Sequence, residues 1–123
     1  MAVFVLVLIG GMLLMLSRQQ QLSAEQSSME VQGARAFWAA QAGLQVATGR
    51  LFPLDNNLQT CAQVPNSVTL TAAGLIGCRA ELQCQSVNHP DQPSRPLFRL
   101  TSSGICSGGS DWQSSRVVEL EVY

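Results

Sequence analysis

The chain has 123 residues, a formal net charge of −1 and seven basic residues, all of them arginine. The arginines are scattered along the chain, so the basic stripe of a nucleic-acid-binding protein is absent and we expect no nucleic-acid partner. The four cysteines all fall in the C-terminal part of the chain. That part is near the lower size limit for a self-sufficient hydrophobic core, so it is expected to need a covalent staple.

The segment Met1–Leu16 carries no charge and no proline. As a helix it reaches about 24 Å, which is short of the roughly 30 Å hydrocarbon core of a bilayer. A secretory signal peptide has a basic beginning and a small-x-small cleavage site, and neither is visible here. We therefore interpret residues 1–17 as the membrane-embedded part of an anchor helix. Further apolar residues, or a short basic leader, are expected upstream of Met1.

A second apolar pattern follows the polar residues after Arg18. It predicts a helix–sheet core stripe at helical spacing, formed by Phe37, Ala40, Leu44, Ala47 and Leu51. Because proline lacks an N–H donor, Pro53 is expected to end the helix just before it. A helix over residues 1–51 is about 75 Å long. That is far longer than a small head needs, so we expect the excess length to pack against a partner.

The helix carries residues that we assign to its assembly face, namely Gly10, Gly11, Glu25, Glu30 and Arg35. The two glycines are either a local weak point where the helix stretches or bends, or ordinary glycines of a lipid span or of a contact between helices. The two glutamates would complement charges inside an assembly, the alternative being a solvated helix face. Trp38 is either at the edge of the core or an anchor between subunits.

Residues 52–123 are predicted to form a small β head. Apolar and polar side chains alternate with the period of two of half-buried strands at Cys78–Val87, Leu97–Ser102 and Arg116–Tyr123, with a possible further strand at Ser67–Thr71. Asn88–Pro96 and Gly104–Ser115 are predicted as loops. One long N-terminal α-helix packed on a small antiparallel β-sheet is an α+β fold.

The four cysteines predict two disulfides formed in an oxidising compartment. Four cysteines allow three pairings; strand parity favours Cys84–Cys106, which leaves Cys61–Cys78 as the second bridge. Free buried thiols are an alternative. The spacings lack the closely paired cysteines of a zinc site, and the lone His89 precedes a proline, so no metal is expected.

No pattern of catalytic residues stands out in the chain. No G-x-S-x-G surrounds any serine, and the single histidine belongs to no recognisable triad. Glu119 and Glu121 share one face of a predicted strand, where a solvated edge is the ordinary interpretation. We therefore expect no enzyme activity, no cofactor and no small-molecule substrate.

The sequence QGARAFWAAQAGL, residues 32–44, resembles the A-R-A-x-x-A-A-x-A-G-L helix signature of minor type IV pilins and pseudopilins. With the segment CRAELQC and a late cysteine, the similarity is greatest to the minor pilins of the mannose-sensitive haemagglutinin (MSHA) pilus. The resemblance implies a pilin-like fold, an anchor in the lipid of the bacterial inner membrane and a periplasmic head. It also implies assembly with other minor pilins and the major pilin, to prime the filament or cap its tip.

The chain departs from that pattern at its beginning. The short basic leader is absent, and no acidic residue precedes Glu25, whereas major pilins place a carboxylate at the fifth mature position. Either those residues lie upstream or the subunit docks without that charge. Arg18 alone would place the head in the cytoplasm, whereas the cysteines favour the periplasm, which we adopt. A minor pseudopilin of type II secretion and a stand-alone membrane-anchored periplasmic binding module are the alternative functions.

Overall fold

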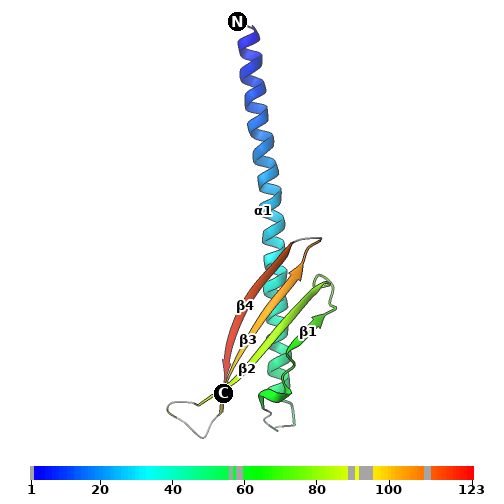
Figure 1. The fold of residues 1–123 in the computed structure, drawn as a ribbon, viewed down its shortest axis with the longest axis vertical. Coiled ribbons are helices and arrows are strands. Elements are labelled where there is room, and N and C mark those ends of the chain that lie inside the picture. Colours follow the sequence, from blue (N-terminus) through cyan, green and yellow to red (C-terminus); the bar gives the residue numbers. More distant parts are fainter. Residues whose placement is uncertain (1, 56, 58–59, 89–90, 92–95, 110–111) are drawn as a thin grey trace. The chain divides into compact units, whose positions relative to one another are not determined.

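A computed structural model describes residues 2–55, 57, 60–88, 91, 96–109 and 112–123; the side chains of residues 2, 21, 22, 24 and 25 lie outside this description, as does His89. The elements in chain order are α1 (Ala2–Leu51), a 3₁₀ turn η1 (Cys61–Gln63), β1 (Ser67–Leu70), β2 (Cys78–Asn88), β3 (Pro96–Ser107) and β4 (Gln113–Val122) (Figure 1). One long helix and one antiparallel sheet confirm the predicted α+β class.

The chain divides into two compact units within α1. The first unit is Met1–Val31, and the second is Gln32–Tyr123, which joins the last part of the helix to the sheet. The helix nevertheless ends at Leu51, the residue predicted from Pro53, and the N–H of Phe52 donates the last helical bond to the carbonyl of Thr48 (2.9 Å). The division of the chain therefore lies about twenty residues before the predicted boundary between helix and head.

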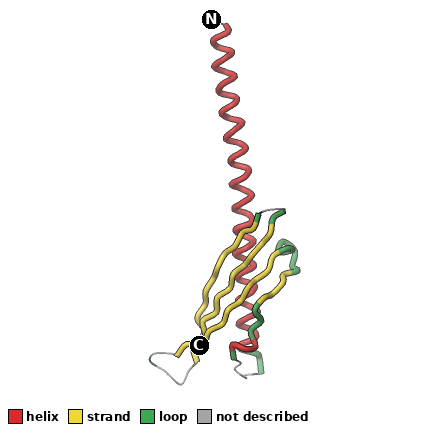
Figure 2. Tube along the Cα trace, in the orientation of Figure 1, coloured by secondary structure: helices red, strands yellow, loops and turns green. Residues whose placement is uncertain are grey.

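The four strands form a meander in the order β1-β2-β3-β4, with every neighbouring pair antiparallel (Figure 2). β3 is longer than predicted because it continues through Gly104 to Ser107, and β4 begins at Gln113. The prediction of a loop from Gly104 is therefore wrong. Glycine in a strand marks a place where another backbone approaches closely, and that is its situation here.

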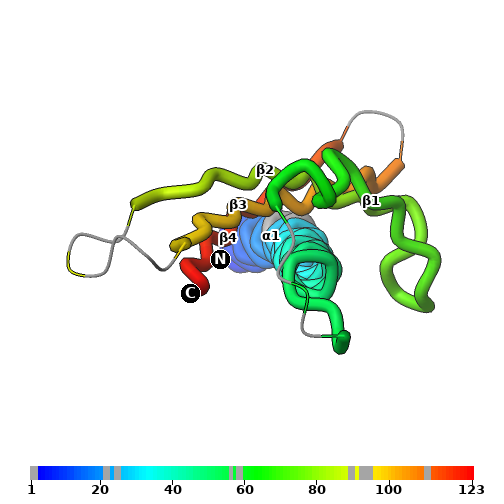
Figure 3. Tube along the Cα trace, turned by 90° about the horizontal axis from the view of Figure 1, so that it is seen from below, coloured from blue at the N-terminus to red at the C-terminus, as the bar shows by residue number. Residues whose placement is uncertain are grey.

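The close approach is between the centre of β3 and one turn of α1. A Cβ atom built on Gly104 would meet the backbone of Ala36 and Ala40. One turn further on, a Cβ on Gly43 would lie 2.6 Å from the Cβ of Ala80. Within the second unit the strands lie on one side of α1 (Figure 3), and small residues on both surfaces allow the helix and the sheet to touch.

This contact sets which helix residues are buried. Ala40, Leu44, Ala47 and Leu51 are at most 5% exposed, as the predicted stripe requires. Phe37 is 41% exposed, so its assignment to the core is wrong. Ala36 is fully buried in its place, because successive helical residues are rotated by about 100° and only a small side chain fits beneath the sheet at that turn.

The core consists of two clusters on the helix-facing side of the sheet. The larger joins the helix end to the middle of the sheet through Leu44, Ala47, Leu51, Val64, Leu82, Phe98 and Leu100. The smaller contains Ala36 and Ala39 with Cys78 and Cys106. Both clusters lie between α1 and the strands of the second unit.

Both predicted disulfide pairings are wrong. The structure pairs Cys78 with Cys106 and Cys61 with Cys84, with Cα–Cα distances of 4.1 and 5.4 Å. The cause is the length of β3: because this strand continues to Ser107, Cys106 lies directly opposite Cys78 in the ladder, whereas Cys84 lies opposite Leu100. Cys84 is then left for Cys61 in η1.

Ser102 provides a test of the helix–sheet contact. Its side chain is fully buried, and its Oγ has no hydrogen-bond partner among the described residues. A buried hydroxyl without a partner is unfavourable, so Ser102→Ala should raise the free energy of unfolding by about 1 kcal/mol. Urea unfolding followed by far-UV circular dichroism measures this change. Ser103→Ala, at the next and only partly buried position, is the control and should have little effect; a clear loss of stability in Ser102→Ala would contradict the prediction.

Candidate functional site

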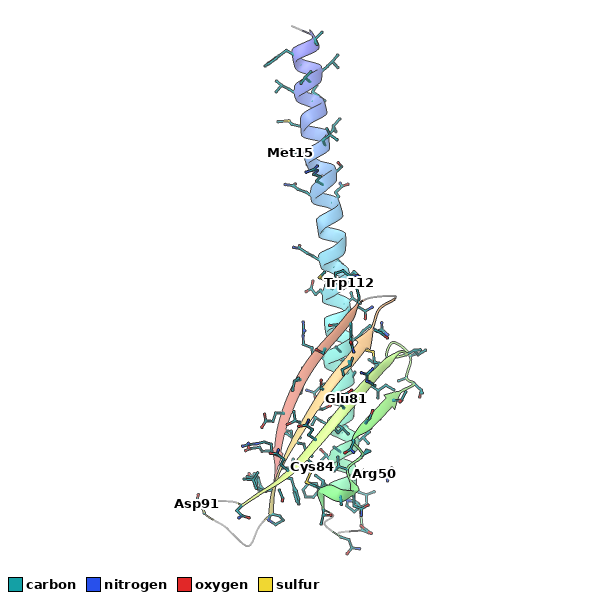
Figure 4. All side chains as sticks on the ribbon, viewed as in Figure 1. Met15, Arg50, Glu81, Cys84, Asp91 and Trp112 are labelled. Carbon is teal, nitrogen blue, oxygen red and sulfur yellow. A yellow bond between two sulfur atoms is a disulfide. The ribbon has the colours of Figure 1, made fainter. Side chains whose placement is uncertain are left out.

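The first unit presents an apolar helical surface. Every large apolar side chain from Val3 to Leu16 is between 51% and 75% exposed. Met15, labelled in Figure 4, is 74% exposed and extends away from the helix. The hydroxyl of Ser17 donates to the carbonyl of Leu14 (2.9 Å), which satisfies a polar group at the end of this surface. By length and composition, Val3–Gln20 is a helix that is able to cross a membrane.

The predicted assembly residues have different surroundings. No atom lies within 4 Å of a Cβ built on Gly10 or Gly11, so both positions are open. Glu30 is exposed. Glu25 is helical, but its side chain lies outside the described part. Arg35 is the exception, because its guanidinium binds groups of its own subunit.

Arg35 fixes the connection between β1 and β2 to the helix. Its Nε donates to the carbonyl of Gly74 (2.7 Å), its Nη2 to the carbonyl of Ile76 (2.8 Å) and its Nη1 to Oε1 of Gln32 (3.1 Å). The connection turns through Gly74 and Gly77, whose φ values of 86° and 82° favour glycine. The arginine of the A-R-A signature thus has a positioning role within the head, which its spacing in the sequence did not indicate.

Two shallow grooves flank the outward surface of α1, and Gln41 and Gln45 border both. The first, about 480 Å³, has an apolar floor that includes Leu44 and Phe52 of the helix end and Val118 and Leu120 of β4. Leu120 is opposite the buried Leu100 and so belongs to the helix-facing side of the sheet, yet it is 39% exposed. The helix therefore leaves the edge strand β4 partly uncovered.

The second groove, about 420 Å³, lies beside an exposed aromatic pair. Trp38 lines it together with Arg35, Ala73 and Leu75. Trp38 is 63% exposed and meets Phe37 edge-to-face, with ring centroids 5.9 Å apart. Both predicted roles of Trp38, at the edge of the core and as an anchor between subunits, therefore stay predictions. Exposed aromatic side chains are characteristic of contact surfaces between proteins.

The other face of the sheet carries charged pairs. Arg99 of β3 donates to Glu121 from Nη2 (2.7 Å) and lies 2.9 Å from Glu119 through Nε. The hydrogen bond to Glu121 and the charges of Glu121 and Glu119 raise the pKa of the Arg99 guanidinium, so it remains charged. Arg79 and Glu81 form a further exposed pair at 3.1 Å. Exposed pairs of this kind contribute little to stability.

No group of three or more metal-ligating side chains occurs among the residues described, and all four cysteines are in disulfides. Comparison with protein-family models, with curated proteins and with solved structures gives no match. A long N-terminal helix and a disulfide-bonded, four-stranded antiparallel head form an α+β architecture that is consistent with a pilin-like fold.

Proposed function

We propose that the chain is a non-enzymatic, minor-pilin-like subunit of a type IV pilus of the MSHA type. Its helix holds it in the bacterial inner membrane with the head in the periplasm. It then assembles with other minor pilins and the major pilin, to prime the filament or cap its tip. The observation that carries the proposal is the exposed apolar surface of Val3–Leu16 on the same helix whose end packs against the head.

This apolar surface is more stable in contact with lipid, or with the helices of neighbouring subunits, than in water. Burial of a large apolar side chain contributes about 1.5–3 kcal/mol, and twelve such side chains are exposed between Val3 and Leu16. Surfaces of this extent are typical of membrane or protein contacts. Lipid around a span and neighbouring helices in a filament both cover such a surface. A subunit that passes from membrane to filament needs this property.

The head offers a second contact surface on the outward side of α1. The pair Phe37–Trp38 is exposed there, and each of the two grooves on either side of Gln41 and Gln45 has apolar side chains in its lining. The opposite face of the sheet carries the ion pairs of Arg99 with Glu119 and Glu121. Neighbouring subunits in the proposed filament therefore contact the helix side of the head in preference to the outer sheet face.

Deletion of the gene in the native host tests the proposal. Surface piliation should fall severely while the cellular level of the major pilin stays unchanged, because a priming or capping subunit acts at assembly. Electron microscopy of cells and immunoblotting of sheared pili measure the two quantities. Normal pili with lost protein export would replace the proposal by a type II secretion pseudopilin, and normal pili with normal export would overturn both.

Site-specific crosslinking supplies a matched control. A photoreactive amino acid at Gln45, which is exposed and borders both grooves, should capture another pilin subunit in vivo. The same probe at Gln83, which is exposed on the predicted polar side of β2, should capture much less. Capture of no pilin from Gln45 would favour a stand-alone binding module instead.

A further inference from the structure

The two disulfides have different surroundings. Cys78 and Cys106 are 2% and 0% exposed, and they pack against Ala36 and Ala39 beneath the helix. Cys61 and Cys84 are only half-buried and lie at the margin of the larger core cluster. The first bridge is therefore shielded from solvent beneath α1, whereas the residues of the second bridge are partly exposed in the folded head.

The accessible bridge fastens the connection between α1 and β1 to the sheet. Cys61 lies in η1, a turn of three residues, and Cys84 lies on β2, where Figure 4 labels it. The residues that follow η1 are also attached to the head. Val64 is 8% exposed, and the carbonyl of Asn66 accepts a hydrogen bond from the N–H of Leu82 (2.8 Å). In η1 itself the N–H of Gln63 donates to the carbonyl of Thr60 (3.0 Å), and the N–H of Val64 donates to the carbonyl of Cys61 (3.2 Å).

The buried bridge has a different role. Cys78 and Cys106 are already opposite each other in the β2–β3 ladder, so this bridge reinforces strands that hydrogen bonds also join. Cleavage of Cys61–Cys84 would leave that ladder and the helix–sheet contact intact. It would free the segment around η1 from its covalent attachment to β2.

We propose that Cys61–Cys84 is a thiol-exchange site for a dithiol reductant, and that its reduction releases η1 and its neighbours, residues 60–66, from their covalent attachment to β2 while Cys78–Cys106 keeps the head folded. A thiolate of the reductant attacks Cys61 Sγ, the bond between the two cysteines breaks, and Cys84 Sγ takes the electron pair and then a proton. The second thiolate of the reductant then attacks the other sulfur of the reductant, the one bonded to Cys61 in the mixed disulfide. Cys61 leaves as a thiolate and is protonated, so the chain gains two electrons and the reductant becomes a disulfide.

Cys61 is the preferred point of attack because of its place in the fold. Exchange requires the attacking, central and leaving sulfurs to be accessible and suitably aligned. Cys84 is held in a strand that pairs with β3, whereas Cys61 lies in a short turn. The turn is able to move without breaking a strand ladder.

Graded reduction of the purified full chain in detergent micelles tests the site. Dithiothreitol is the probe, and the thiols are trapped with N-ethylmaleimide at successive times and assigned by peptide mass spectrometry. Cys61 and Cys84 should be labelled at least about tenfold faster than Cys78 and Cys106, because exchange rates depend on access to the sulfur. Equal rates for the two bridges, or faster reduction of Cys78–Cys106, would overturn the proposal.

Limited proteolysis tests the structural consequence. Thermolysin should cut between Phe52 and Val64 about tenfold faster after partial reduction, since local opening governs cleavage, while the β2–β3 region stays resistant. The variant C61A/C84A should show the same cleavage without reductant, and wild type without reductant is the reference. Loss of resistance throughout the head on reduction of Cys61–Cys84 alone would show that this bridge supports the whole fold, and would also overturn the proposal.

Discussion

Replacement of Gly104 by valine should lower the free energy of unfolding by more than about 3 kcal/mol, beyond the usual cost of an overpacked core. The reason is that any Cβ at this position meets the backbone of Ala36 and Ala40 of α1. A backbone contact cannot be relieved by a change of rotamer, so the helix has to move away from the sheet. Urea unfolding in detergent, followed by near-UV circular dichroism, measures the loss.

Gly49→Ala is the control for that experiment. Gly49 is an exposed helical residue, and no atom lies within 4 Å of a Cβ built on it. Alanine is a better helix former than glycine by about 0.8–1 kcal/mol, so this variant should be more stable than wild type. Wild-type stability in Gly104→Val would show that the helix and the sheet are further apart than the structure places them.

The contact between Gly104 and α1 also explains why the observed core differs from the predicted one. The spacing of Phe37, Ala40, Leu44 and Leu51 identified the helix and most of its buried face correctly. It did not exclude Ala36 as the buried residue in place of Phe37, because alanines occur on both sides of the stripe. Only the distance between helix and sheet decides between them, and that distance depends on Gly104, far away in the sequence.

The same limit applies to the candidate site. Composition alone indicated the apolar surface of Val3–Leu16, because a continuous run of apolar residues can be recognised without knowledge of the tertiary structure. The bonds of Arg35 to the carbonyls of Gly74 and Ile76 join residues about forty positions apart, and backbone carbonyls leave no signature in the sequence. The grooves beside Gln45 depend equally on where β4 lies relative to the helix end.

The disulfide pairing shows how one strand boundary changes a prediction. The alternation of Phe98 and Leu100 predicts a strand, whereas the residues from Gly104 onward predict a loop. With the longer β3, Cys106 moves from the neighbourhood of Cys84 to the position opposite Cys78. The inward or outward position of each cysteine along its strand is therefore not enough to predict the disulfide pairing, because the pairing also depends on the length of the hairpin.

Removal of the buried bridge should have the second large effect on stability. The variant C78A/C106A should lose about 4–6 kcal/mol of unfolding free energy, which combines the chain-entropy contribution of a disulfide with the loss of packing from two buried side chains. The bridge joins residues separated by 28 positions, and its sulfurs pack against Ala36 and Ala39. Thermal unfolding in detergent should show a Tm lower by at least about 15 °C, given the usual dependence of Tm on stability for a small domain.

The variant C61A/C84A is the matched comparison. Its bridge joins residues separated by 23 positions, so the chain-entropy contribution is similar, at about 3 kcal/mol. Its half-buried sulfurs contribute less packing, so this variant should remain more stable than C78A/C106A. The reverse order of stability would show that the accessible bridge, not the buried one, contributes more to the stability of the head. Because both variants lose one disulfide of similar loop length, the difference between them isolates the contribution of burial beneath α1.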